Sequence, residues 1–200
     1  NNAATITPAT LTVTRTETYD GNATFTGTAN AAGTVTGQFT TVSGLLGTDA
    51  MATATSSSAN AAVAGNSFTG FTLSSGTASN YQLASAGVNN AATITPATLT
   101  VTGSKVYDGT TTFVASDLQA SGGVTGEIIQ ITGGTGATTS ADGGTYANSP
   151  LSNLVISVTG GSALASNYLL PTSGTLTITQ AILSISAVGT KAYDGTVTFN

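Results

Sequence analysis

The sequence predicts an all-β protein built from tandem β-sandwich-like modules, arranged head to tail as a semi-rigid rod. The first observation is an exact repeat, because the letters NNAATITPATLTVT occupy residues 1–14 and again residues 89–102. The second is the tripeptide Tyr-Asp-Gly, whose tyrosines stand at positions 19, 107 and 193 and are therefore 88 and 86 residues apart. Self-similarity at so long a period indicates small domains, each with its own core. The chain should hold two modules and the start of a third.

The composition favours strands over helices. Lys and Arg together number 3, Asp and Glu number 8, and charged residues make up 6% of the chain, against roughly 25% in ordinary soluble domains. Threonine supplies much of the polar surface instead, and a β-branched residue fits a pleated sheet better than a helix. We therefore expect no helices.

The residue types that are missing exclude several functions. Without His or Cys, the chain has no imidazole or thiolate for a catalytic triad or for the usual zinc sites. A net charge of −5 disfavours nucleic acids, which bind basic patches. No apolar run approaches the roughly 18 residues of a membrane-spanning helix. We expect no enzyme activity, no cofactor, no metal ion and no nucleic-acid partner.

The module boundaries follow from side-chain parity. Successive residues of a strand face opposite sides of the sheet, so the inward residues share parity. Ile6, before Pro8, is an inward candidate at an even position, whereas Leu11 is one at an odd position. The same change recurs at Pro96 and at Gln180, so one module should pass almost directly into the next, with proline stiffening the junction. We expect the end of a preceding module at 1–8, one module at 9–95, a second at 96–179 and the start of a third at 180–200.

Within each module, short β-rich runs alternate with clusters of Gly, Asn and Ser. This pattern suggests a small β-sandwich or a similar roll. A continuous parallel β-helix is the alternative, but its rungs would recur at a much shorter period. The strands are expected at 10–14, 23–28, 34–42, 68–73 and 81–83 in the first module, and at 110–114, 127–131, 154–158, 168–170 and 175–179 in the second.

The Tyr-Asp-Gly motif is interpreted as a β-hairpin turn. Asp-Gly suits a type I′ turn, since Gly takes positive φ freely and Asp tolerates it better than most residues. The alternative is a carboxylate offered to a ligand or to Ca²⁺, which needs about six to eight oxygen ligands. At an offset of 88 residues Asp49 aligns with Ala137, and Glu127 has no acidic counterpart either, so the ligand alternative is the weaker one. The motif residues are Tyr19, Asp20, Gly21, Tyr107, Asp108, Gly109, Tyr193, Asp194 and Gly195, and the junction residues are Pro8, Pro96 and Gln180.

A second tag, Ala-Ser-Asn-Tyr, recurs at 78–81 and 165–168. It predicts a turn that leads into a strand anchored by a buried tyrosine. We expect all the recurring aromatic side chains to be buried in the modules, which leaves no aromatic cluster for an exposed binding pocket.

The three tags, taken in order, resemble a known family. The runs ITPAxLTVT, KxYDGTTxF and ASNYxL are similar to the YDG/MBG repeat domains of very large bacterial surface and secreted proteins, including filamentous-haemagglutinin-like exoproteins and giant adhesins. The resemblance covers essentially the whole chain. The chain departs from the pattern at Glu17, where a basic residue is usual, and at Gln180, where the junction proline is usual.

The resemblance implies a mostly-β repeat that is secreted or held at the bacterial cell surface and acts in adhesion or biofilm structure. We therefore expect a structural repeat of an extracellular filament or adhesin stalk that gives reach and stiffness. Its partners would be neighbouring modules or copies of itself, and residues 3–14 are the best candidate for β-strand addition to another subunit. The alternative is a Thr-rich β module that binds ice or a host or cell-surface glycan.

Overall fold

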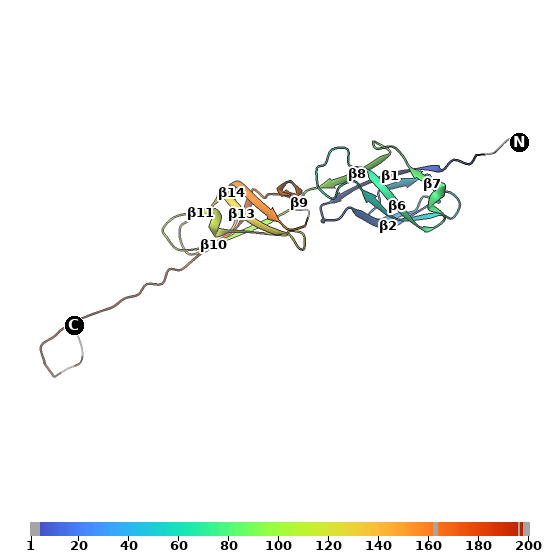
Figure 1. The fold of residues 1–200 in the computed structure, drawn as a ribbon. Coiled ribbons are helices and arrows are strands. Elements are labelled where there is room, and N and C mark those ends of the chain that lie inside the picture. Colours follow the sequence, from blue (N-terminus) through green and yellow to red (C-terminus); the bar gives the residue numbers. More distant parts are fainter. Residues whose placement is uncertain (1–4, 162–163, 196, 198–200) are drawn as a thin grey trace.

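The computed structural model describes residues 5–161, 164–195 and 197 (Figure 1). This part of the chain holds sixteen strands and three short 3-10 helices, which confirms the all-β class. The expectation of no helix is wrong for the three turns, because a three-residue 3-10 turn needs only local hydrogen bonds. None of the helices in the described residues is long and apolar enough to cross a membrane. The turns are η1 (Ala78–Asn80), η2 (Ala115–Asp117) and η3 (Ala165–Asn167).

The strands within residues 9–95, the range expected for the first module, form two sheets. In one of them β1 (Ala9–Thr18) pairs with β4 (Thr41–Ser43) along one edge, and with β7 (Tyr81–Leu83) and β8 (Asn90–Thr95) along the other. The other sheet has the order β3-β2-β5-β6, formed by β2 (Thr24–Asn30), β3 (Val35–Gly37), β5 (Ala50–Ser56) and β6 (Phe68–Ser75).

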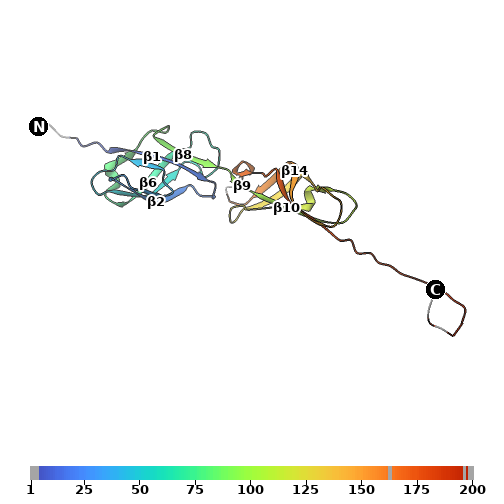
Figure 2. The ribbon, with the colours of Figure 1, turned by 180° about the vertical axis from the view of Figure 1, so that it is seen from behind.

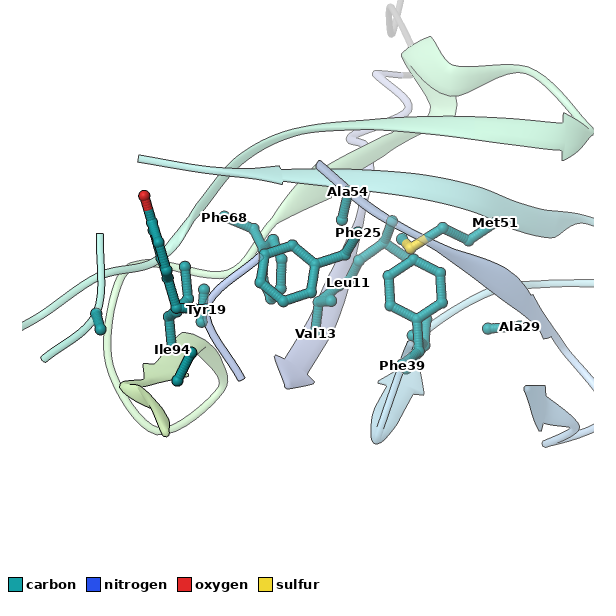
Figure 3. Packing of buried hydrophobic residues seen from close by; sticks show 14 of the residues in the cluster. Leu11, Val13, Tyr19, Phe25, Ala29, Phe39, Met51, Ala54, Phe68 and Ile94 are labelled. Atoms are coloured by element: carbon teal, nitrogen blue, oxygen red, sulfur yellow. The ribbon is translucent and has the colours of Figure 1, made fainter. Parts of the chain in front are cut away.

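Aromatic and aliphatic side chains from both sheets fill the space between them (Figure 3). The rings of Phe25 and Phe68 meet edge to face, with centroids 5.1 Å apart and an interplanar angle of 80°. Leu11 and Val13 reach the same core from β1 and are fully buried. Burial of these apolar surfaces is the main force that holds the module together.

Residues 96–179, the range expected for the second module, form a partly rolled sheet. Its long strand β14 (Gly144–Thr159) pairs first with β16 and then with β13, so the sheet β11-β13-β14-β16-β10-β12 curves into a half-barrel. The ladder shifts register between Tyr146 and Ser149, where Asn148 adopts a φ of 54°. The strands are β10 (Thr100–Val106), β11 (Thr112–Val114), β12 (Leu118–Ser121), β13 (Ile128–Ala137) and β16 (Ser173–Thr179), with a separate pair of β9 (Ala97–Thr98) and β15 (Tyr168–Leu169).

Several strand predictions need correction. The strand expected at 34–42 is broken into β3 and β4, because Gly37 adopts a φ of +69° and lies too close to the Gly27 backbone for any side chain. β5 and β12 have no counterpart among the predicted strands, since Ala, Ser and Gln dilute their β-rich pattern. The strands expected at 127–131 and 154–158 are parts of the longer β13 and β14.

The first and last strands of the first module run parallel and side by side (Figure 2). The turn after β1 therefore lies beside the point at which β8 leaves the module, and the Tyr19 N–H donates to the Thr95 carbonyl at 2.8 Å. Only Pro96 separates β8 from β9. In the second module, Tyr107 donates in the same way to Thr179 at 2.8 Å. The first two Tyr-Asp-Gly turns are thus each fixed beside the last strand of their module.

The change of parity at Pro96 has the predicted effect, because Ile94 is buried in the first module and Val101 in the second. The strand expected at the start of a third module is not seen, since residues 180–195 contain no strand and Leu183 is exposed. Ile6 is exposed as well. Pro8 directly precedes β1, and Gln180 directly follows β16.

Candidate functional site: an interface between the modules

The Tyr-Asp-Gly motif is a corner between sheets. Its glycines have φ of +83°, +79° and +77° in the three copies, as a turn glycine should. The type I′ hairpin is nevertheless wrong, because Asp20 and Asp108 are not at positive φ and β10 and β11 pair with different strands. The Asp20 carboxylate instead accepts the Asn22 N–H at 2.8 Å, and Asp108 accepts the Thr110 N–H at 2.9 Å. Such an Asx turn stabilises the corner without requiring paired strands on either side.

The three motif tyrosines differ in exposure. Tyr19 is 3% exposed, Tyr107 is 48% exposed and Tyr193 is 97% exposed. The expectation that every recurring aromatic is buried within its own module is therefore wrong. What covers Tyr19 is the second module.

The side chain of Tyr19 contacts two residues of the second module, Glu127 and Tyr168. Its hydroxyl donates a short hydrogen bond to Oε1 of Glu127, and its ring meets Tyr168 edge to face, with centroids 5.5 Å apart. Burial, reinforced by the hydrogen bond to Glu127, raises the pKa of Tyr19 to about 12. The phenol therefore stays protonated and can act as a hydrogen-bond donor throughout the physiological range.

Tyr168 completes the arrangement around the carboxylate. Its hydroxyl donates to Oε2 of Glu127 at 2.7 Å and accepts the Val124 N–H at 2.9 Å. Burial raises the pKa of Tyr168 above its ordinary value. The carboxylate of Glu127 thus accepts one phenol from each module, and hydrogen bonds to a charged acceptor are stronger than neutral ones.

Asn167 forms a second set of hydrogen bonds across the junction. Its side chain is fully buried; Oδ1 accepts the Ala61 N–H at 2.9 Å, and the Nδ2 amide donates to Oδ1 of Asn60 at 3.1 Å. The Ala-Ser-Asn-Tyr tag therefore gives the interface two neighbouring side chains, Asn167 and Tyr168. Its predicted role as a turn into a strand with a buried tyrosine is also confirmed.

Apolar packing continues through the junction. One buried cluster joins Ile94 of the first module to Ala97, Leu99 and Ile156 of the second. A separate cluster around Phe113 fills the far half of the second module. The modules therefore share part of their core, and the expectation of one independent core per module is wrong at this boundary.

The acidic residue at the interface, Glu127, has a counterpart in the first module, Asp49. The alignment at a fixed offset of 88 residues, which pairs Asp49 with Ala137, is therefore wrong at this position. Thr12 of β1 pairs with Ser43, and the equivalent Thr100 of β10 pairs with Ser121. Counted from these two serines, Asp49 and Glu127 occupy the same position, six residues on. The segment before β12 is shorter than the one before β4, so a constant offset hides the match.

The recurrence extends to the hydrogen bonds. Tyr81 donates to Oδ2 of Asp49 at 2.7 Å and accepts the Leu46 N–H at 3.1 Å. Tyr168 has the same two roles with Glu127 and Val124. The hydrogen bond to Asp49 raises the pKa of Tyr81. A sequence signal could have revealed this pair. In both modules a Ser-Gly dipeptide is followed, five residues after the glycine, by an acidic residue, at 43–49 and at 121–127.

One of three comparisons with known proteins found a match, and it covers the second module and the strand that leads into it. Residues 90–178 match the family model described as YDG domain. The matched segment begins at β8, the last strand of the first module, and ends within β16, so it contains both strands that meet at Pro96. Comparisons with curated proteins and with solved structures gave no match.

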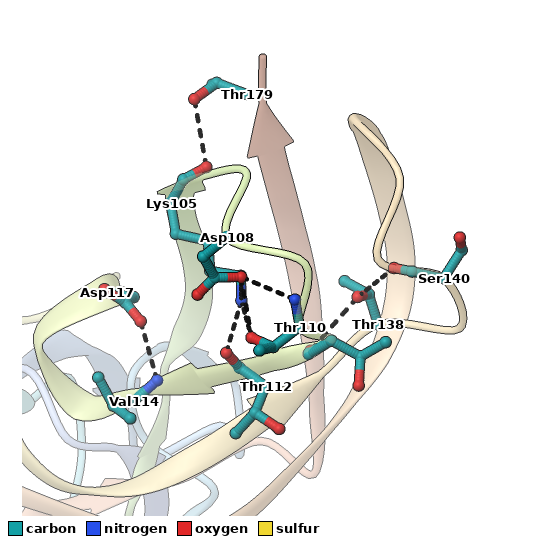
Figure 4. A network of polar contacts seen from close by, with 10 residues as sticks. Lys105, Asp108, Thr110, Thr112, Val114, Asp117, Thr138, Ser140 and Thr179 are labelled. Atoms are coloured by element: carbon teal, nitrogen blue, oxygen red, sulfur yellow. Dashed lines mark hydrogen bonds and ion pairs between the residues drawn. The ribbon is translucent and has the colours of Figure 1, made fainter. Parts of the chain in front are cut away.

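In the segment that matches the YDG model, a lysine neutralises the motif aspartate (Figure 4). Lys105 Nζ lies 2.8 Å from Oδ1 of Asp108 and also donates to Thr110 Oγ1 and to the Thr112 carbonyl. This ion pair holds the pKa of Asp108 down to about 2. Lys191 and Asp194 repeat the pair at 2.7 Å. The motif carboxylates are therefore engaged by their own turns, and the described residues contain no group of three or more acids that could hold a metal ion.

The first module lacks this lysine. Glu17 stands in its place, is largely buried, and accepts a hydrogen bond from Nε2 of Gln38 at 2.8 Å. Burial, with a smaller contribution from the nearby Asp20 carboxylate, raises the pKa of Glu17 to about 7. The departure from the YDG pattern thus gives the first module a titratable group near neutral pH.

We expect the stability of the first module to fall as pH rises through this range. A raised pKa means that the folded state binds the Glu17 proton more tightly than the unfolded state, so the stabilisation is complete below about 4.5 and is lost by about 7. The loss should be about 2 kcal/mol after allowance for solvent screening. Urea unfolding of the intact chain at pH 4.5 and pH 7.5 measures it. Glu17→Gln is the control, and an equal pH dependence in that variant would show that another group is responsible.

A matched pair of glycine variants separates the turn from the interface. At Gly109 an added Cβ meets nothing within 4 Å, so Gly109→Ala should cost only the strain of positive φ, about 1–2 kcal/mol. At Gly21 the added Cβ would lie 2.9 Å from Cγ1 of Val124 in the other module. Gly21→Ala should therefore cost more than Gly109→Ala in thermal unfolding. Equal losses would mean that the Gly21 turn does not contact the second module in solution.

Proposed function

We propose that the chain is a structural spacer of a secreted or surface-attached bacterial filament or adhesin stalk, in which modules stack head to tail as a semi-rigid rod for adhesion or biofilm formation. The observation that carries the proposal is the bridge from Tyr19 through Glu127 to Tyr168. This bridge joins a motif of one module to a motif of the next. A spacer needs such a connection at each boundary, and at the boundary around Pro96 two recurring motifs supply it, through Tyr19 and Tyr168.

Stiffness follows from how many contacts a rotation at the junction would break. Besides the Glu127 bridge, rotation would separate Asn167 from Asn60 and Ala61 and expose part of the shared apolar cluster. The connection itself is one residue, Pro96, whose ring fixes φ. A short, hydrogen-bonded junction restrains two domains far more than a flexible linker does.

The extracellular role draws support from the order of the three repeated tags and from the YDG match at 90–178. We do not propose β-strand addition, because residues 9–14 of the candidate donor already lie in β1, where residues 9–11 pair with β7 and residues 12–14 pair with β4. Of the rest of that donor segment, residues 3 and 4 lie outside the described residues. Modules that follow one another in a single chain are a simpler way to lengthen the filament.

Small-angle scattering tests the spacer function directly. A second copy of residues 8–95 inserted after Thr95 keeps the natural Thr-Pro connection at both joints. The maximum dimension should increase by about 30–45 Å per added module, the length of a ten-residue strand with its loops at about 3.3 Å per residue. An unchanged maximum dimension, with the modules folded back on one another, would contradict the proposal.

A Thr-rich binding module is the second candidate, and one observation favours it. Thr26, Thr53 and Thr72 form a row across β2, β5 and β6. The hydroxyls of Thr53 and Thr72 bond each other at 2.7 Å, which leaves them less free to bind a ligand than an open array would be. Thermal hysteresis and glycan-array binding of the intact chain test this candidate. Loss of any signal in Thr26→Val would place the binding on this row.

A further inference from the structure

The first module repeats, at its N-terminal end, the receiving half of the observed interface. Asp49 and Tyr81 are bonded to each other as Glu127 and Tyr168 are. Asn80 precedes Tyr81 just as Asn167 precedes Tyr168, each as the last residue of a 3-10 turn. Glycines also lie against both carboxylates: an added Cβ would meet Asp49 at Gly76 and Glu127 at Gly161.

No described residue docks on this face, which is formed by Asp49, Asn80 and Tyr81. Oδ2 of Asp49 accepts the Tyr81 hydroxyl, while Oδ1 has no hydrogen bond there, although the equivalent Oε1 of Glu127 accepts Tyr19. The side chain of Asn80 is exposed and makes no hydrogen bond within the described residues, whereas Asn167 is fully buried.

An exposed leucine marks the same place. Leu46 corresponds to Val124, because each donates its backbone N–H to the tyrosine hydroxyl. At the formed junction Val124 packs against the Gly21 turn. Leu46 is 62% exposed in the part of the chain that the structure describes. An apolar side chain of that size in solvent fits a contact that the described residues do not supply.

From these observations we infer that the Asp49 face is a docking site for the Tyr-Asp-Gly end of a further module of the same repeat, joined in tandem. The inference rests on the proposed spacer function and names the partner that the N-terminal end of the first module would bind. A motif phenol would donate to Oδ1 of Asp49, the Asn80 amide would pair with a loop equivalent to Asn60 and Ala61, and Leu46 would cover the turn glycine.

The residues that precede the first module support a tandem module as the occupant of the Asp49 face. Residues 5–8 have the same letters, Thr-Ile-Thr-Pro, as residues 93–96 at the formed junction. Ile6 is exposed where its equivalent, Ile94, is buried in the module that Tyr19 belongs to. A tandem connection also raises the effective concentration of the two faces to the millimolar range, so a small interface can form without high intrinsic affinity.

Insertion of a second copy of residues 8–95 after Thr95 creates the proposed contact in one chain. The first copy then presents its own Tyr19, Asn60 and Ala61 to the Asp49 face of the inserted copy. The original junction, between Tyr19 of the inserted copy and Glu127, remains beside it as an internal reference. The donor face is the same at both junctions, and only the receiving residues differ.

The matched test is Asp49→Ala made separately in each copy. Both variants lose the hydrogen bond to Tyr81, but only the one in the inserted copy also loses a docking acceptor. We expect the unfolding midpoint of the inserted module to fall by about 4–8 °C more than that of the first copy, the shift that corresponds to about 1 kcal/mol in a domain of this size. Asp49→Asn, which keeps an acceptor oxygen, should show a smaller difference.

The outcomes separate this inference from the spacer proposal. Equal losses in the two copies, with the Tyr19–Glu127 contact intact by NMR, would overturn the docking inference alone. Loss of both contacts, with the modules tumbling independently, would overturn the spacer proposal as well. If Asp49→Ala prevents folding, the same comparison with Leu46→Ser decides the matter, because Leu46 takes no part in the Asp49–Tyr81 hydrogen bond.

Discussion

Replacing Glu127 with Ala is expected to uncouple the two modules, at a cost of about 2–4 kcal/mol. The carboxylate accepts a phenol from Tyr19 and another from Tyr168, and both tyrosines are buried. Each buried donor left without an acceptor costs about 1–3 kcal/mol. Denaturant unfolding followed by NMR signals from each module should change from one shared transition to two.

Two variants serve as controls for that experiment. Glu127→Gln keeps an acceptor oxygen for one phenol and should lose less than the Ala variant. Asp49→Ala removes the equivalent acid at the free end of the first module, where only Tyr81 loses its partner, and should leave the coupling unchanged. A single cooperative transition in Glu127→Ala would mean that the apolar cluster alone joins the modules.

Truncation of Phe25 to Ala is expected to have the largest effect on stability, about 3–5 kcal/mol, which is the usual range for a fully buried phenylalanine. Phe25 has no exposed surface and contacts Phe68 edge to face. Because the ring lies between the two sheets of the first module (Figure 3), its loss leaves a cavity that neither sheet can close alone. Urea unfolding of the intact chain measures the change.

The comparison with Phe113→Ala shows how far the damage spreads. Phe113 is equally buried but belongs to the cluster in the far half of the second module, whereas Phe25 belongs to the cluster that crosses the junction. Phe25→Ala should therefore lower the protection of amides around Tyr168 from hydrogen exchange, and Phe113→Ala should leave amides around Phe25 largely unchanged. Damage confined to the first module in Phe25→Ala would contradict a shared core.

The parts of the fold that the sequence predicts depend on local patterns. Thr-rich alternation predicts the all-β class, and the change of parity around Pro96 predicts where Ile94 and Val101 are buried. Both patterns require only that side chains alternate along a strand. The strand at 81–83 is predicted with its observed bounds because a turn motif immediately precedes it.

The errors come from contacts that a local pattern does not contain. Asp-Gly indicates a tight turn, but whether the strands on either side pair with each other depends on the parallel pairing of β1 with β8, which are far apart in sequence. The role of Glu127 is hidden for a related reason. Its partner Tyr19 lies 108 residues away, and its counterpart Asp49 is displaced by the different loop lengths of the two modules.

If the repeated tags hold neighbouring modules in one fixed orientation, as we propose, residual dipolar couplings will reveal it. Couplings measured for backbone amides of β1, β2 and β5, and for those of β10, β13 and β14, should fit a single alignment tensor in the intact chain. In Glu127→Ala the two sets should require different tensors. Two independent tensors in the unaltered chain would mean that the Tyr19–Glu127–Tyr168 bridge does not fix the orientation of the modules.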